Sequence, residues 1–310
     1  MFKTVEVDVW AFDAEWVPDP VAGRALYRLP ADMDDSEVVL EMWQRNGATE
    51  EDPNPFLKVA MCRVVSIAMV MRHRRGDGRI ELDLRSQPRD PGSAEACEEA
   101  GIISRFLRSI GQRGPQLVGF NSIGSDLPIL IQRGIVNGIS APKFCKRPKK
   151  PWEGRDYFAR GSDWNIDLMS AVRGWGKARP SLKELAVLSG IPGKLDNFDG
   201  GSVAEAWLDG NIARIVRYNE HDALTTYLVW LRMAYFAGHL TAEQYEQEQH
   251  QLRELLETRA QSKKNEHLVD YVREWDRLRG VAEDELEPAA LDGTPPVPED
   301  PSPSLADRDE

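Results

Sequence analysis

The stretch TVEVDVWAFDAEW, residues 4–16, decides the fold. Alternate positions from Val5 to Ala11 are apolar, and two aromatic residues make the intervening face apolar as well. This pattern predicts a central strand buried on both faces. The same period of two places Asp13 and Glu15 on the face of the valines, at the carboxyl end of the strand. Two carboxylates are therefore expected where a buried strand would otherwise be apolar.

The segments that follow alternate between strand and helix patterns. A polar, acidic insertion over residues 18–55 comes first. Strands are predicted at residues 64–71, 79–84 and 116–120, and helices at residues 94–110, 127–136, 212–238 and 241–279. This order predicts an α/β domain with a mixed sheet flanked by helices.

The charge is distributed unevenly over the 310 residues. The formal charge is −12, yet the last 30 residues alone hold ten acidic residues, one Arg and six prolines. Such a segment buries too little apolar surface to offset its ordering entropy, so residues 281–310 are predicted to be a disordered acidic tail. The expected organisation is a catalytic domain over residues 1–240, a helical extension over residues 241–280 and this tail. The other 280 residues are nearly neutral in net charge, so their charge excludes no class of ligand.

Two further absences set the expected location. No run of apolar residues is long enough for a membrane helix, and the first ten residues lack the pattern of a signal peptide. Three cysteines at long spacings form neither a disulfide framework nor a CxxC pair. A cytoplasmic protein without a membrane partner is the expectation.

Acidic residues in separate segments form the strongest chemical signal. Asp126 begins a predicted helix near Asn121, and Tyr218 and Asp222 lie one turn apart in the long helix. Together with the two acids of the first strand, these carboxylates would make an all-oxygen pocket suited to Mg²⁺ or Mn²⁺. Two such ions can activate a water and stabilise the attacking and leaving oxygens at a phosphodiester, with a Tyr hydroxyl orienting the water.

Taken singly, each residue has an ordinary structural alternative. Asp13 could be a strand-end turn residue and Asp126 a helix N-cap. Tyr218 could be a core tyrosine, and Asp222 could lie on a solvated helix face. Only the order and placement of the set favour a metal site.

The motifs that carry these residues resemble the DEDD superfamily of 3'-5' exonucleases. Within this superfamily, they resemble the predicted exonucleases related to the proofreading domain of family B DNA polymerases. The motifs are FDAEW (residues 12–16), FNSIGSDLPIL (residues 120–130) and YNEHD (residues 218–222). The resemblance implies a ribonuclease H-like fold with a five-stranded sheet.

The resemblance also assigns roles. Asp13, Glu15, Asp126 and Asp222 would be the metal ligands, and Tyr218 would position the attacking water. Asn121 would contact the substrate backbone or brace the site. The tyrosine four residues before the last Asp, with Arg217 in the place of a histidine, indicates the tyrosine subtype.

Three positions differ from the family pattern or leave their role open. Ser125 stands where an aromatic residue is usual, and Asn219 stands where a small residue or Cys is common, a difference expected to have no consequence. Asp167 lies in a family-like context, and either a structural hydrogen bond or a role near the site would explain it.

A basic segment bears on the substrate. Residues 143–160 (KFCKRPKKPWEGRDYFAR) hold seven Lys or Arg against two acids, with four interleaved aromatic residues. Exposed rings among basic residues suit single-stranded nucleic acid. An ordinary solvated loop is the alternative. The residues expected to bind the strand, besides Asn121, are Lys146, Arg147, Lys149, Lys150 and Trp152.

The leading hypothesis is a metal-dependent 3'-5' exonuclease of single-stranded DNA that uses two Mg²⁺ or Mn²⁺ ions. An exoribonuclease or a hydrolase of short oligonucleotides would share the same metal centre. A silent nucleic-acid-binding module is the alternative from another class, although such a module has no need to keep repelling carboxylates together. A replication or repair partner, or self-association through the 241–280 helix, would complete the expected interactions.

Overall fold

The computed structural model describes residues 2–159, 161–173, 179–195, 198 and 200–286. Its centre is a mixed sheet of five strands in the order β3-β2-β1-β4-β5. The strands are β1 (Asp8–Pro18), β2 (Cys62–Arg74), β3 (Ile80–Gln87), β4 (Gln116–Gly119) and β5 (Asn165–Asp167). β1 pairs antiparallel with β2 and parallel with β4, so it is the central strand. The predicted mixed five-stranded α/β sheet is confirmed.

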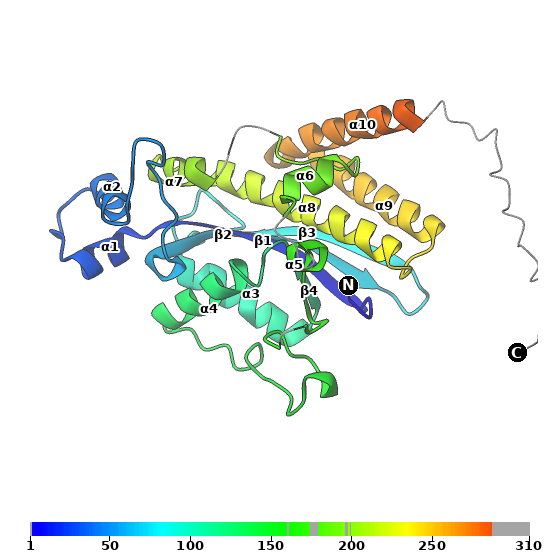
Figure 1. Ribbon diagram of the computed structural model, residues 1–310, viewed down its shortest axis with the longest axis horizontal. Coiled ribbons are helices and arrows are strands. Elements are labelled where there is room, and N and C mark those ends of the chain that lie inside the picture. Colours follow the sequence, from blue (N-terminus) through cyan, green and yellow to red (C-terminus); the bar gives the residue numbers. More distant parts are fainter. Residues whose placement is uncertain (1, 160, 174–178, 196–197, 199, 287–310) are drawn as a thin grey trace, which may run out of the picture.

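Helices cover both faces of the sheet (Figure 1). The helices before the long one are α1 (Pro20–Tyr27), α2 (Asp35–Arg45), α3 (Glu99–Arg113), α4 (Asp126–Val136), α5 (Leu168–Arg173), α6 (Leu182–Val187) and α7 (Gly200–Leu208). The remaining three are α8 (Ile212–Phe236), α9 (Ala242–Ala260) and α10 (His267–Leu286), with short 3₁₀ turns at Val59–Met61, Pro151–Glu153 and Lys263–Asn265.

The two faces of β1 lie in two different cores. Val9 and Ala11 pack in the core that contains α8, α9 and α10. Trp10 and Phe12 pack in the core that contains α3 and α4. All four side chains are at most 2 % exposed, which is the two-sided burial that the sequence predicts for this strand. The face of Val9 and Ala11 continues toward Asp13, which therefore points to the side of α8.

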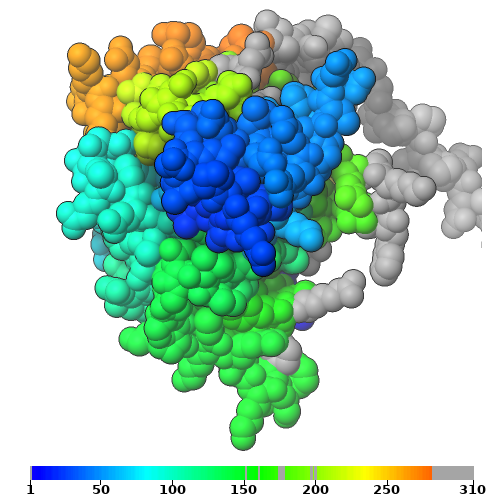
Figure 2. Space-filling view, turned by 90° about the vertical axis from the view of Figure 1, so that its left-hand side faces the viewer, coloured from blue at the N-terminus to red at the C-terminus, as the bar shows by residue number. Residues whose placement is uncertain are grey.

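The acidic insertion after β1 contains two helices that the sequence analysis missed. The Asp19 side chain accepts a hydrogen bond from the Val21 backbone and caps α1, which begins at Pro20. Asp34 caps α2 in the same way through Ser36. Asp followed by Pro is a helix-start signal, so the first of these helices was recognisable. Figure 1 shows this pair in blue at one end of the molecule, and Figure 2 looks onto that end.

The prediction of one long helix after residue 241 is wrong. The chain turns through a 3₁₀ segment at Lys263–Asn265, and α9 and α10 form an antiparallel hairpin in which Arg253 pairs with Asp276 and Arg279 with Glu246. The turn lets both apolar stripes reach the same core: Leu252 and Leu256 of α9 are fully buried there, as is Trp275 of α10. This helical extension therefore shares its core with the sheet.

The last described helix overlaps the predicted tail, and the described helices were also compared with the requirements of a membrane span. α10 continues to Leu286, so the first six residues of the predicted tail are helical, and residues 287–310 lie outside the described part. Within the described residues, no helix combines the length and the apolar character that a membrane crossing requires.

Candidate active site

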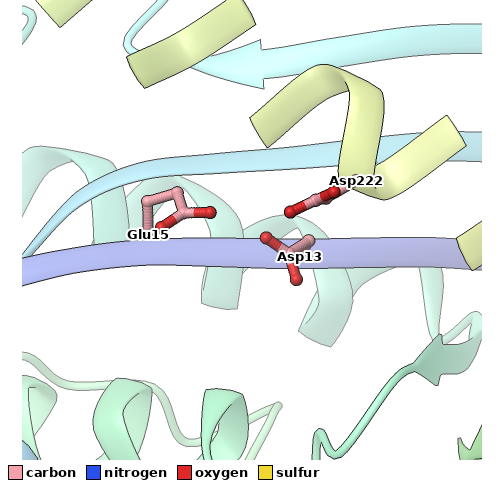
Figure 3. Close-up of side chains that lie close together, drawn as sticks. All are labelled: Asp13, Glu15 and Asp222. Atoms are coloured by element: carbon pink, nitrogen blue, oxygen red, sulfur yellow. The ribbon is translucent and has the colours of Figure 1, made fainter. Parts of the chain in front are cut away.

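Three carboxylates from two distant segments meet above the centre of the sheet. Asp13 and Glu15 extend from β1, and Asp222 extends from α8 (Figure 3). One ligand atom from each lies within 4.8 Å of the other two. The sequence prediction placed these residues together, and the structure brings them together.

Local backbone geometry explains this placement. Asp13 and Glu15 are two residues apart in an extended strand, so their side chains leave the same face, over which α8 passes. The register between β1 and β2 shifts between Glu15 and Trp16. Such a bulge re-aims the side chains next to it and often lies near active sites.

The electrostatic environment opposes the ionised form of both β1 acids. Burial raises the pKa of Asp13 well above its usual value, and the charges of Asp126, Glu15 and Asp222 raise it further. Burial likewise raises the pKa of Glu15, followed by Asp222 and Asp126, whereas Lys194 acts in the opposite direction. Like charges at this spacing favour a bound proton or a bound cation.

Asp126 lies beside the three clustered carboxylates and outside that group. It is 3 % exposed at the start of α4. The backbone N–H of Ala14, the residue between the two β1 acids, donates to Asp126 Oδ1 at 3.1 Å, and Ser125 Oγ lies 3.1 Å from Oδ2. Burial raises its pKa to about 7, although both of these hydrogen bonds act to lower it.

Tyr218 forms one wall of the site. It lies one turn before Asp222 on α8, is 9 % exposed and hydrogen-bonds to Asp222. Its ring packs edge-on against Phe198, with centroids 5.0 Å apart, and the Lys194 ammonium lies 5.4 Å from the ring centroid. Burial and the neighbouring charge of Asp222 raise the pKa of Tyr218 far above its usual value, so the phenol stays neutral.

Asn219 is a site residue that sequence reasoning missed. Its amide nitrogen donates to Asp13 Oδ2 at 2.7 Å, and its amide oxygen accepts from Ser66 Oγ at 2.9 Å. The side chain is fully buried. A polar residue on the buried face of a helix, three residues before Asp222, was the signal that could have identified it. Asn219, which departs from the family pattern, thus orients the Asp13 carboxylate of the acidic cluster.

The loop between β4 and α4 is held by Asp167. Its carboxylate accepts from the backbone N–H groups of Asn121, Ile123 and Ser170 at 3.0 to 3.2 Å. Asn121 takes up a left-handed conformation with φ 63°, and its carbonyl accepts from Ser125 Oγ at 2.8 Å. The open question about Asp167 is thus resolved in favour of structural hydrogen bonds. Ser125 replaces packing by an aromatic ring with polar contacts to Asn121 and Asp126.

The donor set fits a divalent cation. The clustered atoms are carboxylate oxygens, the ligands that Mg²⁺ and Mn²⁺ prefer, and their mutual repulsion is the kind that a cation relieves. Lys194 is the cationic side chain that lowers the pKa of Glu15, and it does not outweigh burial and the neighbouring acids. The three carboxylates therefore form an acidic cluster whose oxygen atoms are suited to bind a divalent cation.

The basic segment lies on the other side of the sheet from α8. Tyr157 donates to the carbonyl of Pro115, just before β4, and the segment projects at the bottom of Figures 1 and 2. β4 pairs in parallel with Val9–Ala11 of β1, and Asp13 and Glu15 follow this paired part of β1. Pro115 precedes β4, so this anchor lies toward the amino-terminal end of the two parallel strands, away from the two acids. The expectation of exposed rings is wrong for Phe144 and Tyr157, which are 1 % and 5 % exposed because they join the α3–α4 core.

The expected strand-binding residues of this segment are exposed. Trp152 is 79 % exposed, and the Lys150 ammonium lies 5.8 Å from its ring centroid. Arg147 pairs with the buried carboxylate of Asp156 at 3.0 Å, and Lys150 pairs with Glu153 at 3.4 Å. Lys146 and Lys149 are also exposed.

The sheet order, with an acidic cluster between its central strand and α8, is consistent with a ribonuclease H-like fold. A family model described as a predicted 3'-5' exonuclease related to the exonuclease domain of PolB matches residues 54–275, and the chain belongs to this family. The match begins after Asp13 and Glu15 and so does not include them, whereas the structure places both beside Asp222. A search of curated proteins found no match.

Proposed function

We propose that the protein is a divalent-metal-dependent 3'-5' exonuclease that shortens single-stranded DNA. The observation that carries this proposal is the meeting of Asp13, Glu15 and Asp222 within 4.8 Å on a fold of an exonuclease family. Half-buried acids that repel one another weaken a protein unless they bind a cation. A cytoplasmic location stays an expectation.

In this proposal Asp13, Glu15, Asp222 and Asp126 hold two Mg²⁺ or Mn²⁺ ions. When bound, such ions generate a strong nucleophile from water and stabilise the attacking and leaving oxygens of an in-line displacement. The chain itself fixes the ligands: Asn219 orients Asp13, and the Ala14 backbone orients Asp126. Metal ligands held by such outer contacts need little reorganisation when the cation binds.

Tyr218 orients the attacking water. Its hydroxyl stays protonated, because burial and Asp222 raise its pKa, so it does not take up the proton of the water. A neutral phenol that donates to Asp222 still has lone pairs that can accept a hydrogen bond from a water. The Phe198 contact restricts the ring to this position.

The proposed substrate contacts are Asn121 and the exposed residues Lys146, Arg147, Lys149, Lys150 and Trp152. Asn121 is half-buried in the loop that precedes Asp126, where it can face the backbone of a strand. A replication or repair partner, or a second copy, binding at the α9–α10 hairpin also remains a proposal.

The test follows the shortening of single-stranded DNA and RNA of one sequence, labelled at either end, with Mg²⁺, Mn²⁺ or EDTA. Asp222→Asn is compared with Asp77→Asn, an exposed carboxylate in the turn between β2 and β3. We expect stepwise removal of nucleotides from the 3' end of DNA, lost with EDTA and in Asp222→Asn and retained in Asp77→Asn.

The other outcomes separate the alternatives. Faster shortening of RNA would make the protein an exoribonuclease, and activity confined to strands of a few nucleotides would make it an oligonucleotide hydrolase. Strand binding without shortening under any metal would identify a silent binding module. Full activity in Asp222→Asn would refute the assigned site.

A further inference from the structure

Lys194 follows the short helix α6 and lies beside the acidic cluster. Two neighbours fix its backbone: Ile191 is 1 % exposed in the core, and the carbonyl of Pro192 accepts from Thr225 Oγ1 at 2.9 Å. Thr225 lies three residues after Asp222 on α8, so this contact is within one turn of a cluster carboxylate. α6 itself packs on α8 (Figure 1). The segment that carries this lysine is therefore held against the helix that carries Asp222.

The side chain of Lys194 is exposed, and its ammonium lies 5.4 Å from the centroid of the Tyr218 ring. The face of an aromatic ring attracts an ammonium without neutralising its charge. Among the described residues, no carboxylate forms an ion pair with this ammonium. The charge of Lys194 is thus available to an anion that enters the site.

Two residues of the proposed site lie within the influence of this charge. Burial, Asp222 and Asp126 raise the pKa of Glu15, whereas Lys194 lowers it. Tyr218, which the ammonium approaches, hydrogen-bonds to Asp222. Lys194 therefore lies near both a proposed metal ligand and the residue proposed to orient the attacking water.

The charge balance of the proposed site leaves a role for such a cation. The four carboxylates and the two divalent ions of the proposed function sum to zero, so the phosphodiester keeps its negative charge. In hydrolysis, the water oxygen bonds to phosphorus and releases a proton to solvent. The bond from phosphorus to the 3' oxygen of the preceding nucleotide breaks, and that oxygen takes up a proton. A preorganised donor aimed at the non-bridging oxygens stabilises the charge that develops there.

We propose that Lys194 is a further catalytic residue, whose ammonium binds a non-bridging oxygen of the phosphate that is cut. The proposal rests on the proposed function for the position of that phosphate. It assigns Lys194 to the substrate and not to the support of the carboxylates. The same side chain should therefore oppose the binding of a cation, because like charges repel, and favour hydrolysis.

The test compares Lys194→Gln, which removes the charge, with Lys194→Arg, which keeps it. Lys3→Gln is the matched control, since Lys3 is exposed and precedes β1 at the end away from the two acids. Calorimetry measures Mn²⁺ affinity and, at saturating Mn²⁺, the affinities for thymidine 5'-monophosphate and thymidine. Hydrolysis of labelled single-stranded DNA gives kcat and KM. Thermal melting establishes that each variant is folded.

We expect Lys194→Gln to lower kcat by about 100-fold, as the loss of one donor to a developing oxyanion does in other enzymes. Its affinity for thymidine 5'-monophosphate should fall about tenfold, whereas its affinity for thymidine, which lacks the phosphate, should not change. Its Mn²⁺ affinity should rise by about two- to fivefold, because an exposed like charge is removed. Lys194→Arg should recover most of the lost kcat, and Lys3→Gln should match the wild type throughout.

A wild-type kcat in Lys194→Gln overturns the proposal. A fall in its Mn²⁺ affinity also overturns it, because that result would show that Lys194 only holds the carboxylates in place.

A failure of the proposed function gives a different result. A wild-type protein that shortens no strand, but binds thymidine 5'-monophosphate more tightly than Lys194→Gln does, would uphold the phosphate contact and reject the exonuclease. Metal-dependent shortening at the same rate by both proteins, with equal affinity for the monophosphate, would reject the role of Lys194 alone.

Discussion

Two regions of the described structure hold carboxylates that are buried or half-buried, and the partners of these carboxylates differ. Between α3 and α4, Arg133 bridges Glu99 and Asp19 at 2.6 Å, and all three side chains are at most 7 % exposed. Arg72 binds Glu248 through two nitrogens in the same manner. In and beside the acidic cluster, the donors to Asp13 and Asp126 are an amide, a backbone N–H and a hydroxyl.

The difference teaches how the protein separates stability from function. A guanidinium bound at two oxygens supplies both charge and hydrogen bonds, so the buried acid is compensated in the folded chain. Neutral donors orient a carboxylate and leave most of its charge in place. The first arrangement holds elements together, whereas the second preserves an attraction for an external cation.

The largest expected effects come from neutralising one acid in each region. Asp13→Asn should reduce strand hydrolysis by at least about 1,000-fold, because a metal contributes several kcal/mol to the transition state and each 1.36 kcal/mol is tenfold in rate. Glu99→Gln should lower the free energy of unfolding by about 3 to 5 kcal/mol, since Arg133 then lacks its main counter-charge. Turnover and urea denaturation measure the two effects.

If the two regions have separate roles, Asp13→Asn should leave stability unchanged or improved, and Glu99→Gln should leave activity unchanged. Metal-free Asp13→Asn should be no less stable than the wild type, because it relieves repulsion. Glu99→Gln should keep its activity per folded molecule at low temperature. A destabilised Asp13→Asn protein with intact activity would show that the cluster is structural.

An intermediate effect is expected from the neutral donor Asn219. Asn219→Ala removes the 2.7 Å contact to Asp13 and should weaken Mn²⁺ binding by about 10- to 100-fold, as for other residues that orient metal ligands. Calorimetric titration with Mn²⁺ measures this. Ser66→Ala removes only the hydrogen bond to the amide oxygen of Asn219, so it should weaken Mn²⁺ binding less than Asn219→Ala does. Equal affinity in Asn219→Ala and the wild type would contradict a positioning role.

The smallest effect is expected from pH. The pKa of Asp126 is raised to about 7, so the metal-free folded protein holds a proton that the unfolded chain releases near pH 4. Stability of the metal-free protein should therefore fall as pH rises from about 4 to about 7. Mn²⁺ must displace that proton, so its affinity should rise over the same range.

Thermal melting and Mn²⁺ titration between pH 5 and pH 8 follow the two trends. Asp126→Asn serves as the reference because it has no proton to exchange at this position, so both slopes should become shallower. Stability that rises with pH in the metal-free wild type would reject the assignment to Asp126.

Local patterns were sufficient for much of the fold. The alternation around β1 predicted its two-sided burial, and the helical spacing in α8 predicted that Tyr218 and Asp222 share a face. The two missed helices, α1 and α2, and the turn at Lys263–Asn265 have short or polar signals. Apart from the Asp19–Pro20 start signal of α1, these features depend on packing between elements, which a local window does not contain.

The candidate site, like the fold, has features that local sequence patterns predict and features that only the packing of distant segments determines. The sequence by itself determined which carboxylates lie on which face, because strand and helix periods act over a few residues. Only the tertiary structure decided that Asn219 binds Asp13 across 206 positions and that Asp167 holds the loop of Asn121. It also placed the basic segment and α8 on opposite sides of the sheet. These relations depend on how helices cross the sheet, and packing of remote segments sets that geometry.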